Sequence, residues 1–374
     1  MSTTKKIIGL IGATLILILL IIGKHVFNEM GALYTDKENT VKYGHYPYYS
    51  TTENQFLSPE TLVFFPERVT GGNAGMKRFF TKSPNAPQKQ LPIITLQKSD
   101  YLSEPSPYAI YWLGHSSAML EIDKIRILID PVLDNAAPFP GVNPRFSPSP
   151  IQRQELPPID IVLLTHDHYD HLEARTMKYL KDKETHFIAP LGVGARLKGW
   201  GIHSDKITEI AWDETFTLST LQITATPGIH YSGRSQTDKN KTLWAGYALK
   251  GKDKNIFWSG DSGYGTHFKE IGEKYGPFDL ACVEIDAWNN GWPNTHLFPK
   301  EVIQVCQDVK AGILLPTHWA VFDMALHPWD ESIRQVYSLA RQNQIEILTP
   351  LMGEKVIPGE TQTGAWWETY TTKR

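Results

Sequence analysis

Residues 166–171 contain three histidines and two aspartates in the pattern His-x-His-x-Asp-His. The pattern directly follows the largely apolar run 159–164, which is typical of a buried strand. Imidazole and carboxylate groups are good Zn²⁺ ligands, and few structural roles demand so many of them in so short a segment. The sequence therefore predicts a two-metal hydrolase site, with four of its ligands here: His166, His168, Asp170 and His171.

Three further apolar runs, within residues 221–317, end in the same way. They lead to His230, Asp261 and His318. A buried strand that delivers a side chain from its end holds it rigidly at one edge of a sheet, so we expect these segments to converge. Seven ligands suit two metals with one bridging carboxylate. Such a pair lowers the pKa of water toward ~7 and can clamp both the attacking and the phosphoryl or carbonyl oxygen. Zinc is the expected metal, and iron or manganese remains open at a site of nitrogen and oxygen ligands.

Composition limits the other functions that this chain of 374 residues can have. The formal net charge of −3 argues against nucleic-acid binding driven by bulk charge. The two cysteines, Cys282 and Cys306, exclude a cysteine-rich zinc finger or a disulfide framework. We expect them to be buried thiols.

The N-terminus carries an uncharged apolar run over residues 7–23, preceded by Lys5 and Lys6. As a helix this run nearly crosses a bilayer, so residues 1–24 are predicted to be an uncleaved transmembrane signal anchor. A cleaved signal peptide is the alternative. The two lysines favour the cytoplasmic side for the N-terminus, which places the rest of the chain on the periplasmic side of a bacterial inner membrane.

The remaining chain divides into three parts. Residues 25–105 are predicted to be an irregular extension that wraps the core, with a short helix over 76–80. Residues 106–350 form the hydrolase domain, and 351–374 a C-terminal tail. Alternation and turn signals predict strands and helices in the order of a layered α/β sandwich. The strands are expected at 109–113, 118–122, 125–129, 160–164, 186–189, 207–210, 216–225, 243–250, 255–259, 279–285, 312–315 and 345–348, and the helices at 172–183, 299–309 and 330–342.

The histidine motif, the order of the strand ends and the candidate bridging carboxylate resemble the metallo-β-lactamase superfamily. The similarity is closer to one branch, the N-acyl-phosphatidylethanolamine-hydrolysing phospholipase D family and its bacterial relatives. It covers roughly residues 65–350 and is carried by the segments 112–122, 130–133, 156–160, 259–264 and 316–322. The resemblance implies a four-layer αββα sandwich behind the N-terminal membrane anchor.

The resemblance also implies roles for individual residues. One zinc is assigned His166, His168 and His230, the other Asp170, His171 and His318, and Asp261 bridges them. His296 is expected near the phosphate, so that Asp170, Asp261 and His296 take part in catalysis. The implied reaction is attack of metal-bound hydroxide on a phosphodiester, N-acyl-phosphatidylethanolamine or a related glycerophospholipid. Because neither cysteine occupies a ligand position, phosphoesters and lactones suit the site better than β-lactams.

Substrate contacts are predicted from weaker signals. Trp292, Trp319 and Phe322 are interpreted as an apolar wall for acyl chains or as ordinary aromatic core, and His115 as a residue under the site. Arg234 is expected at the surface, with pairing to a phosphate as the alternative.

Two other functions stay open. The first is a lactonase or small phosphoester hydrolase with the same ligands, which needs neither the anchor nor the aromatic wall. The second is a non-catalytic zinc-binding envelope protein. The expected partners are the phospholipid or other phosphodiester substrate and the membrane, with no nucleic acid, and a homodimer is left open.

Overall fold

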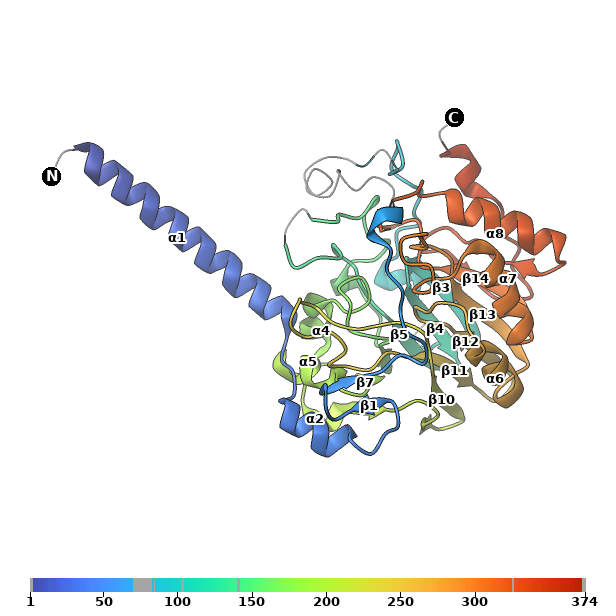
Figure 1. Ribbon diagram of the computed structural model, residues 1–374. Coiled ribbons are helices and arrows are strands. Elements are labelled where there is room, and N and C mark those ends of the chain that lie inside the picture. The colour runs from blue at the N-terminus through green and yellow to red at the C-terminus, as the bar shows by residue number, and fades with distance from the viewer. Residues whose placement is uncertain are drawn as a thin grey trace.

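Two seven-stranded sheets lie face to face in the computed structural model, which describes residues 3–69, 83, 85–101, 104–139, 142–324 and 326–371 (Figure 1). The first sheet has the order β16-β3-β4-β5-β6-β7-β8. Strands β3 to β5 are antiparallel, and β5 to β8 run parallel, so their carboxyl ends share one edge. Its strands are β3 (Tyr108–Gly114), β4 (Ser117–Ile122), β5 (Ile125–Ile129), β6 (Ile161–Leu163), β7 (His186–Pro190), β8 (Ile207–Ile210) and β16 (Lys355–Val356).

The second sheet has the order β15-β14-β13-β12-β11-β10-β9. Its members are β9 (Thr215–Leu218), β10 (Leu221–Thr226), β11 (Gly246–Lys250), β12 (Asn255–Trp258), β13 (Phe278–Glu284), β14 (Ala311–Thr317) and β15 (Glu346–Ile347). The single strand predicted over 216–225 is wrong. Ser219 has a φ of 54° and turns the chain there, so β9 and β10 form an antiparallel hairpin.

Helices cover the outer face of each sheet, which gives four layers (Figure 1). On the first sheet lie α4 (Ala174–Leu180) and α5 (Val193–Gly199), and on the second α6 (His267–Lys274), α7 (Pro299–Asp308) and α8 (Glu331–Gln342). The predicted mixed α/β sandwich is therefore confirmed. Short α5 and α6 were not predicted, and the helix expected over 172–183 is shorter at both ends.

Alternation along the strands explains this layering. In β6, Ile161 and Leu163 pack between the sheets, while Val162 packs against the helices. In β12, Trp258 faces the same central core and Phe257 faces the outer layer. Successive side chains of a strand point to opposite faces, and both faces are buried, so these strands are apolar throughout.

The N-terminal residues form α1 (Thr3–Met30), which projects away from the sandwich (Figure 1), and then α2 (Asp36–Tyr43) with a hairpin of β1 (Tyr49–Ser50) and β2 (Gln55–Phe56). Among the described residues, one helix segment, Gly12–Met30, is long and apolar enough to cross a membrane; a signal sequence can have the same character. The helix predicted over 76–80 lies outside the described residues.

The C-terminal segment joins the core. Strand β16 pairs with β3 at an edge of the first sheet, and Trp367 is buried beside Trp319. Cys282 and Cys306 are buried free thiols, as predicted.

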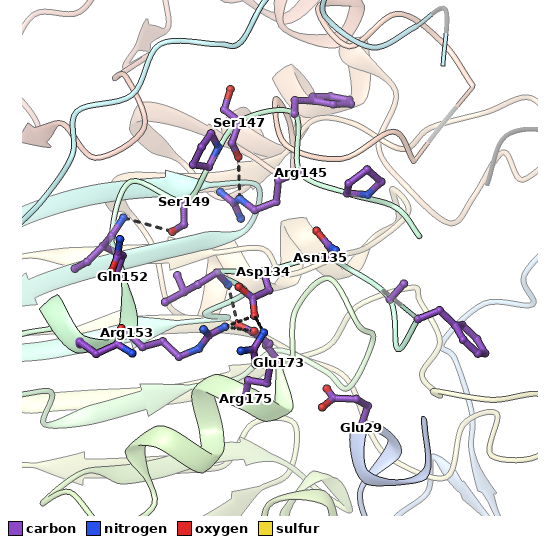
Figure 2. Close-up of a pocket in the computed structure, with 18 of the residues that line it drawn as sticks. Glu29, Asp134, Asn135, Arg145, Ser147, Ser149, Gln152, Arg153, Glu173 and Arg175 are labelled. Carbon is purple, nitrogen blue, oxygen red and sulfur yellow. Dashed lines mark hydrogen bonds and ion pairs between the residues drawn. The ribbon is translucent and has the colours of Figure 1, made fainter. Parts of the chain in front are cut away.

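A cavity of about 770 Å³ opens between the end of α1 and the loops around residues 133–154 (Figure 2). Four of its charged side chains form ion pairs with one another. Arg153 pairs with Glu173 and Asp134, and Arg175 also pairs with Asp134. None of the predicted metal ligands lines this cavity.

Candidate metal centre

Four strand ends bring the predicted ligands to one edge of the sandwich. His166 lies three residues after the end of β6, and His230, Asp261 and His318 follow β10, β12 and β14. Just before Asp261, Gly260 has a φ of 59°, and a Cβ there would lie 2.7 Å from the carbonyl oxygen of Ala245. Only glycine fits this sharp turn without strain, and the turn aims Asp261 at the histidines.

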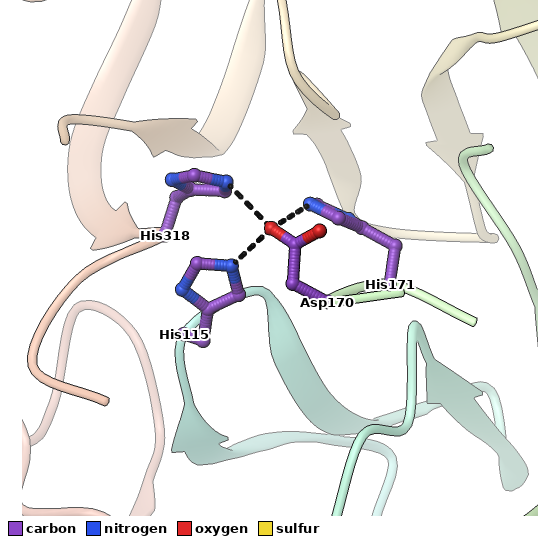
Figure 3. Close-up of side chains that lie close together, drawn as sticks. All are labelled: His115, Asp170, His171 and His318. Atoms are coloured by element: carbon purple, nitrogen blue, oxygen red, sulfur yellow. Dashed lines mark hydrogen bonds and ion pairs between the residues drawn. The ribbon is translucent and has the colours of Figure 1, made fainter. Parts of the chain in front are cut away.

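The first group of side chains surrounds Asp170 (Figure 3). Its Oδ2 lies 2.9 Å from Nε2 of His115 and 3.4 Å from Nε2 of both His171 and His318. His115, predicted as a residue under the site, is 1% exposed and bonds to Asp170. His115 therefore contacts the predicted ligand Asp170 from the protein interior.

The second group consists of His166, His168, His230 and Asp261, whose candidate ligand atoms all lie within 4.8 Å of one another. Nδ1 of His168 is 2.9 Å from Nε2 of His166 and 3.4 Å from Nε2 of His230. The structure thus brings all seven predicted ligands together in two adjoining groups.

Asp261 lies at the boundary between the groups. Its Oδ2 is 3.1 Å from Nε2 of both His171 and His318, and 3.8 and 3.7 Å from Nε2 of His166 and His230. A carboxylate in this position can act as a metal ligand together with the histidines of either group.

Electrostatics around Asp261 and His318 favour positive charge, whereas burial lowers the pKa of His166, His168 and His230. Burial raises the pKa of Asp261, but the neighbouring His171 and His318 outweigh burial and hold it well below its usual range. Burial likewise opposes charge on His318, yet Asp261 and Asp170 raise its pKa to about 10. Two buried carboxylates that stabilise cationic partners are the charge environment that a divalent cation needs.

Unsatisfied polar atoms test whether the residues fit a metal. Nε2 of His171, both ring nitrogens of His318 and Oδ1 of Asp261 are buried without a well-aligned hydrogen bond to any described residue. Buried polar atoms are seldom left unpaired, and neutral imidazole and carboxylate are the donors that Zn²⁺ prefers. The donor set therefore fits metal ions held by both groups.

Asp130 supports the loop of residues 166–171, called the metal-binding loop below because it carries four candidate ligands. The sequence did not predict this role. Its Oδ2 lies 2.8 Å from Nδ1 of His171, and it accepts hydrogen bonds from the backbone N–H and hydroxyl of Thr165. A carboxylate on the far nitrogen of a ligand histidine fixes the ring orientation. The available signal was its position, because Asp130 directly follows the buried strand β5.

His296 lies beside the second group and is held by Glu284. Oε2 of Glu284 is 2.9 Å from Nδ1 of His296, and the Glu284 side chain is fully buried. A ligand atom of His296 lies within 4.8 Å of those of Asp261 and His318. His296 is also among the residues that line the adjoining cavity.

That cavity has a volume of about 720 Å³ and a partly apolar wall. Trp292 lines it together with Phe64 of the N-terminal extension, and the two rings stack with centroids 6.5 Å apart. Tyr231, which the sequence analysis did not single out, also lines it and packs on His168.

The other two predicted aromatic contacts lie elsewhere. Trp319 is 1% exposed and stacks on Trp112 in the outer core, and Phe322 packs edge-on against His115. Neither lines the cavity beside His296.

A family model described as a beta-lactamase superfamily domain matches residues 125–319, which include every candidate ligand named above except His115. The chain belongs to the metallo-β-lactamase superfamily. Within this superfamily it is 38% identical to an uncharacterized protein of Mycobacterium tuberculosis (strain ATCC 25618 / H37Rv), over 76% of this chain and 78% of that protein.

Two further comparisons concern a named enzyme and a solved structure. It is 31% identical to N-acyl-phosphatidylethanolamine-hydrolyzing phospholipase D 1 of Caenorhabditis elegans, over 73% of this chain and 85% of that protein. Among solved structures, a metallo hydrolase from Ignicoccus hospitalis KIN4/I matches with a TM-score of 0.53 and 18% identity, over 67% of this chain and 97% of the other. The latter similarity shows the fold alone. Family, fold and the histidine–aspartate cluster together identify a metallo-hydrolase.

Proposed function

We propose that the protein is a phosphodiesterase of the phospholipase D type that cleaves N-acyl-phosphatidylethanolamine or a related glycerophospholipid. Water adds to phosphorus, the bond between phosphorus and the N-acylethanolamine oxygen breaks, and the leaving oxygen takes a proton. The products are phosphatidate and N-acylethanolamine. The observation that carries this proposal is the 31% identity over 85% of the C. elegans phospholipase, joined to a seven-ligand cluster beside an apolar-walled cavity.

We assign the cluster two Zn²⁺ ions: His166, His168 and His230 would hold one, Asp170, His171 and His318 would hold the other, and Asp261 would serve both. When bound, the ions supply Lewis acidity and a hydroxide nucleophile at neutral pH.

The surrounding side chains orient the reacting groups. Glu284 accepts from Nδ1–H of His296, which leaves Nε2 of His296 free to face a phosphoryl oxygen in the cavity. When both ring nitrogens carry protons, Nε2 donates to this oxygen and stabilises the charge that develops on phosphate during the reaction. Asp130 and Thr165 hold the His171 ring from behind, so that this ligand need not reorganise when substrate binds.

An apolar wall and the N-terminal helix support a lipid substrate. Phe64 and Trp292 offer stacked rings to an acyl chain next to His296. Helix α1 is predominantly apolar within Gly12–Met30, which supports its assignment as a bilayer anchor with the sandwich on the periplasmic side. An anchored site meets its lipid substrate at the high local concentration of a membrane.

The test is an assay of the full-length protein, purified in detergent and supplied with Zn²⁺. We expect release of phosphatidate from N-acyl-phosphatidylethanolamine in mixed micelles, and loss of that activity in His168→Ala. Hydrolysis of simple lactones without release of phosphatidate would instead assign the protein to the lactonase alternative. Activity retained by His168→Ala would contradict the two-metal mechanism.

A further inference from the structure

Two buried arginines lie directly behind the metal-binding loop. Arg196 belongs to α5 and is 1% exposed, and Arg234, in the loop after His230, is 5% exposed. The surface position predicted for Arg234 is wrong, because its guanidinium is enclosed by backbone carbonyl groups and aromatic rings.

Both arginines hold Asp167, the residue between the candidate ligands His166 and His168. Oδ2 of Asp167 accepts from Nε and Nη2 of Arg196, at 3.1 and 3.0 Å. Nη1 of Arg234 donates to the carbonyl oxygen of Asp167 at 2.8 Å. The loop that carries four of the seven candidate ligands is thus fixed from its rear by two cations.

Arg234 adds two further contacts to the same loop. Its Nη1 donates to the carbonyl oxygen of Leu172, at 2.8 Å, and its guanidinium carbon lies 3.8 Å from the ring centroid of Tyr169. A cation over an aromatic face is attracted by the ring, and burial strengthens the attraction. Arg234 therefore contacts the segment from Asp167 to Leu172 at both ends and, through Tyr169, between them.

The same guanidinium groups reach the carboxyl end of α1. Nη1 of Arg196 donates to the carbonyl oxygen of Met30 at 3.0 Å, and Nη2 of Arg234 to that of Glu29 at 2.8 Å. The indole N–H of Trp200 completes the set by donating to Asn28, at 2.7 Å. The last carbonyl groups of a helix lack partners within the helix and carry partial negative charge. The last turn of α1 has no basic residue, so the catalytic domain supplies the cations.

We propose that Arg196 and Arg234 are positioning residues that couple the position of the C-terminal end of α1 to the geometry of the metal-binding loop. A displacement of the helix end moves the two guanidinium groups, and these move the loop through Asp167. The metal affinity of the site then depends on the position of the C-terminal end of α1 relative to these arginines. This inference rests on the metal centre and holds whichever substrate the enzyme cleaves.

Gly31 offers a way to displace the helix end without touching the loop. It has a φ of 70°, and a Cβ there would lie 3.0 Å from the ring of Trp200 and 3.2 Å from Cα of Arg196. A β-branched side chain is strained in this backbone conformation and would push the helix end away. Gly23 is the control within α1, because a Cβ there meets nothing within 4 Å, whereas Gly31 directly follows the helix.

The experiment measures Zn²⁺ affinity of the full-length protein in detergent by competition with a fluorescent chelator. We expect Gly31→Val to weaken zinc binding by about 10-fold, the size seen when a group that orients a ligand is lost. Gly31→Ala should shift the affinity in the same direction by less, and Gly23→Val should leave it unchanged. Arg234→Lys, which keeps the charge, should lose less affinity than Arg234→Gln.

Linkage supplies a second readout that needs no substitution. If the helix end affects metal binding, metal binding must affect the helix end by the same free energy. Adding Zn²⁺ to the wild-type protein should therefore slow amide hydrogen exchange over residues 28–34. Wild-type zinc affinity in the folded Gly31 variants, or exchange over residues 28–34 that zinc leaves unchanged, would overturn the proposal.

Discussion

Glu284 lies 2.9 Å from His296, carboxylate oxygen to Nδ1, in a pair of which the carboxylate is fully buried. Glu284 also accepts from the backbone N–H of Ser262, the residue after Asp261, at 3.1 Å. One carboxylate thus fixes both a candidate phosphate-binding imidazole and the turn that presents a candidate metal ligand. Such a group controls the orientation of its neighbours without contacting substrate.

Glu284→Gln should therefore lower kcat for phosphodiester cleavage by roughly 10- to 100-fold, with little change in KM or zinc content. The amide can still accept the hydrogen bond from Nδ1 of His296 but lacks the charge of a carboxylate. Steady-state kinetics and metal analysis would check this. Glu301→Gln is the control, because Glu301 caps α7 through Phe298 and should leave kcat unchanged. A change in KM alone would contradict this role.

Asp261→Ala should remove the carboxylate at the boundary of the two groups. Its Oδ2 lies within 3.8 Å of four imidazole nitrogens, so its loss leaves neither metal with its full ligand set. We expect the zinc content to fall below two ions per chain, and activity to fall on the order of 10³-fold. Elemental analysis of the dialysed protein gives the count. Asp308→Ala, on the outer helix α7, should retain both ions.

His267 should make the stability of the protein fall in acid. Burial lowers the pKa of this histidine from the ordinary 6.5 to about 4, so it stays neutral in the folded state while the unfolded chain takes up a proton. The contribution of neutral His267 to the free energy of unfolding is therefore complete above pH 6.5 and is lost as the pH falls toward about 4. The full loss amounts to about 3 kcal/mol. Thermal midpoints of wild type and His267→Gln, measured across this range, should converge in acid. Parallel curves would exclude the effect.

Trp292→Ala should weaken binding of long acyl chains. Its ring stacks on Phe64 in the wall of the cavity beside His296. Removal of the ring would therefore leave a bound acyl chain exposed to water. We expect KM for a long-chain N-acyl substrate to rise roughly 10-fold while a short-chain analogue is little affected. Leu218→Ala, an exposed leucine on β9, is the matched control. Equal effects on both chain lengths would place the acyl group elsewhere.

Charges placed in α1 should release the protein from membranes. Leu17 and Leu20 are exposed on the isolated helix, and arginine at the centre of a bilayer costs about 3 kcal/mol per residue. The double substitution to arginine should shift the protein from the alkali-washed membrane fraction to the supernatant. Val41→Arg, on an exposed position of α2, should not. Wild-type protein in the supernatant would mean that α1 is no anchor.

The sequence predicted much of the fold because strands buried on both faces appear as unbroken apolar runs. The runs before His166 and His318 are apolar on both faces of their sheets, and a polar residue after such a run is conspicuous. Short helices with glycine, such as α5, leave no comparable record. A strand pattern also continues through Ser219, where only the backbone conformation shows the turn.

Supporting residues were harder to predict, because their partners are distant in the chain. Asp130 meets His171 across 41 positions, and Arg234 meets Glu29 across 205. Nothing in the local sequence distinguishes such a carboxylate or guanidinium from a solvated one. Trp319 illustrates the converse, since an aromatic next to a ligand can equally belong to the core.

The pairing of β16 with β3 has a consequence for biogenesis. Strand β3 is made early, and its free edge is covered only when residues 355–356 have left the ribosome. Helix α1, in contrast, precedes β3 in the chain, and as the proposed anchor it would reach the membrane first. With that anchor, the nascent chain would be held at the membrane long before its first sheet is complete, and the unprotected strand edge would lie at a surface where chaperones can reach it.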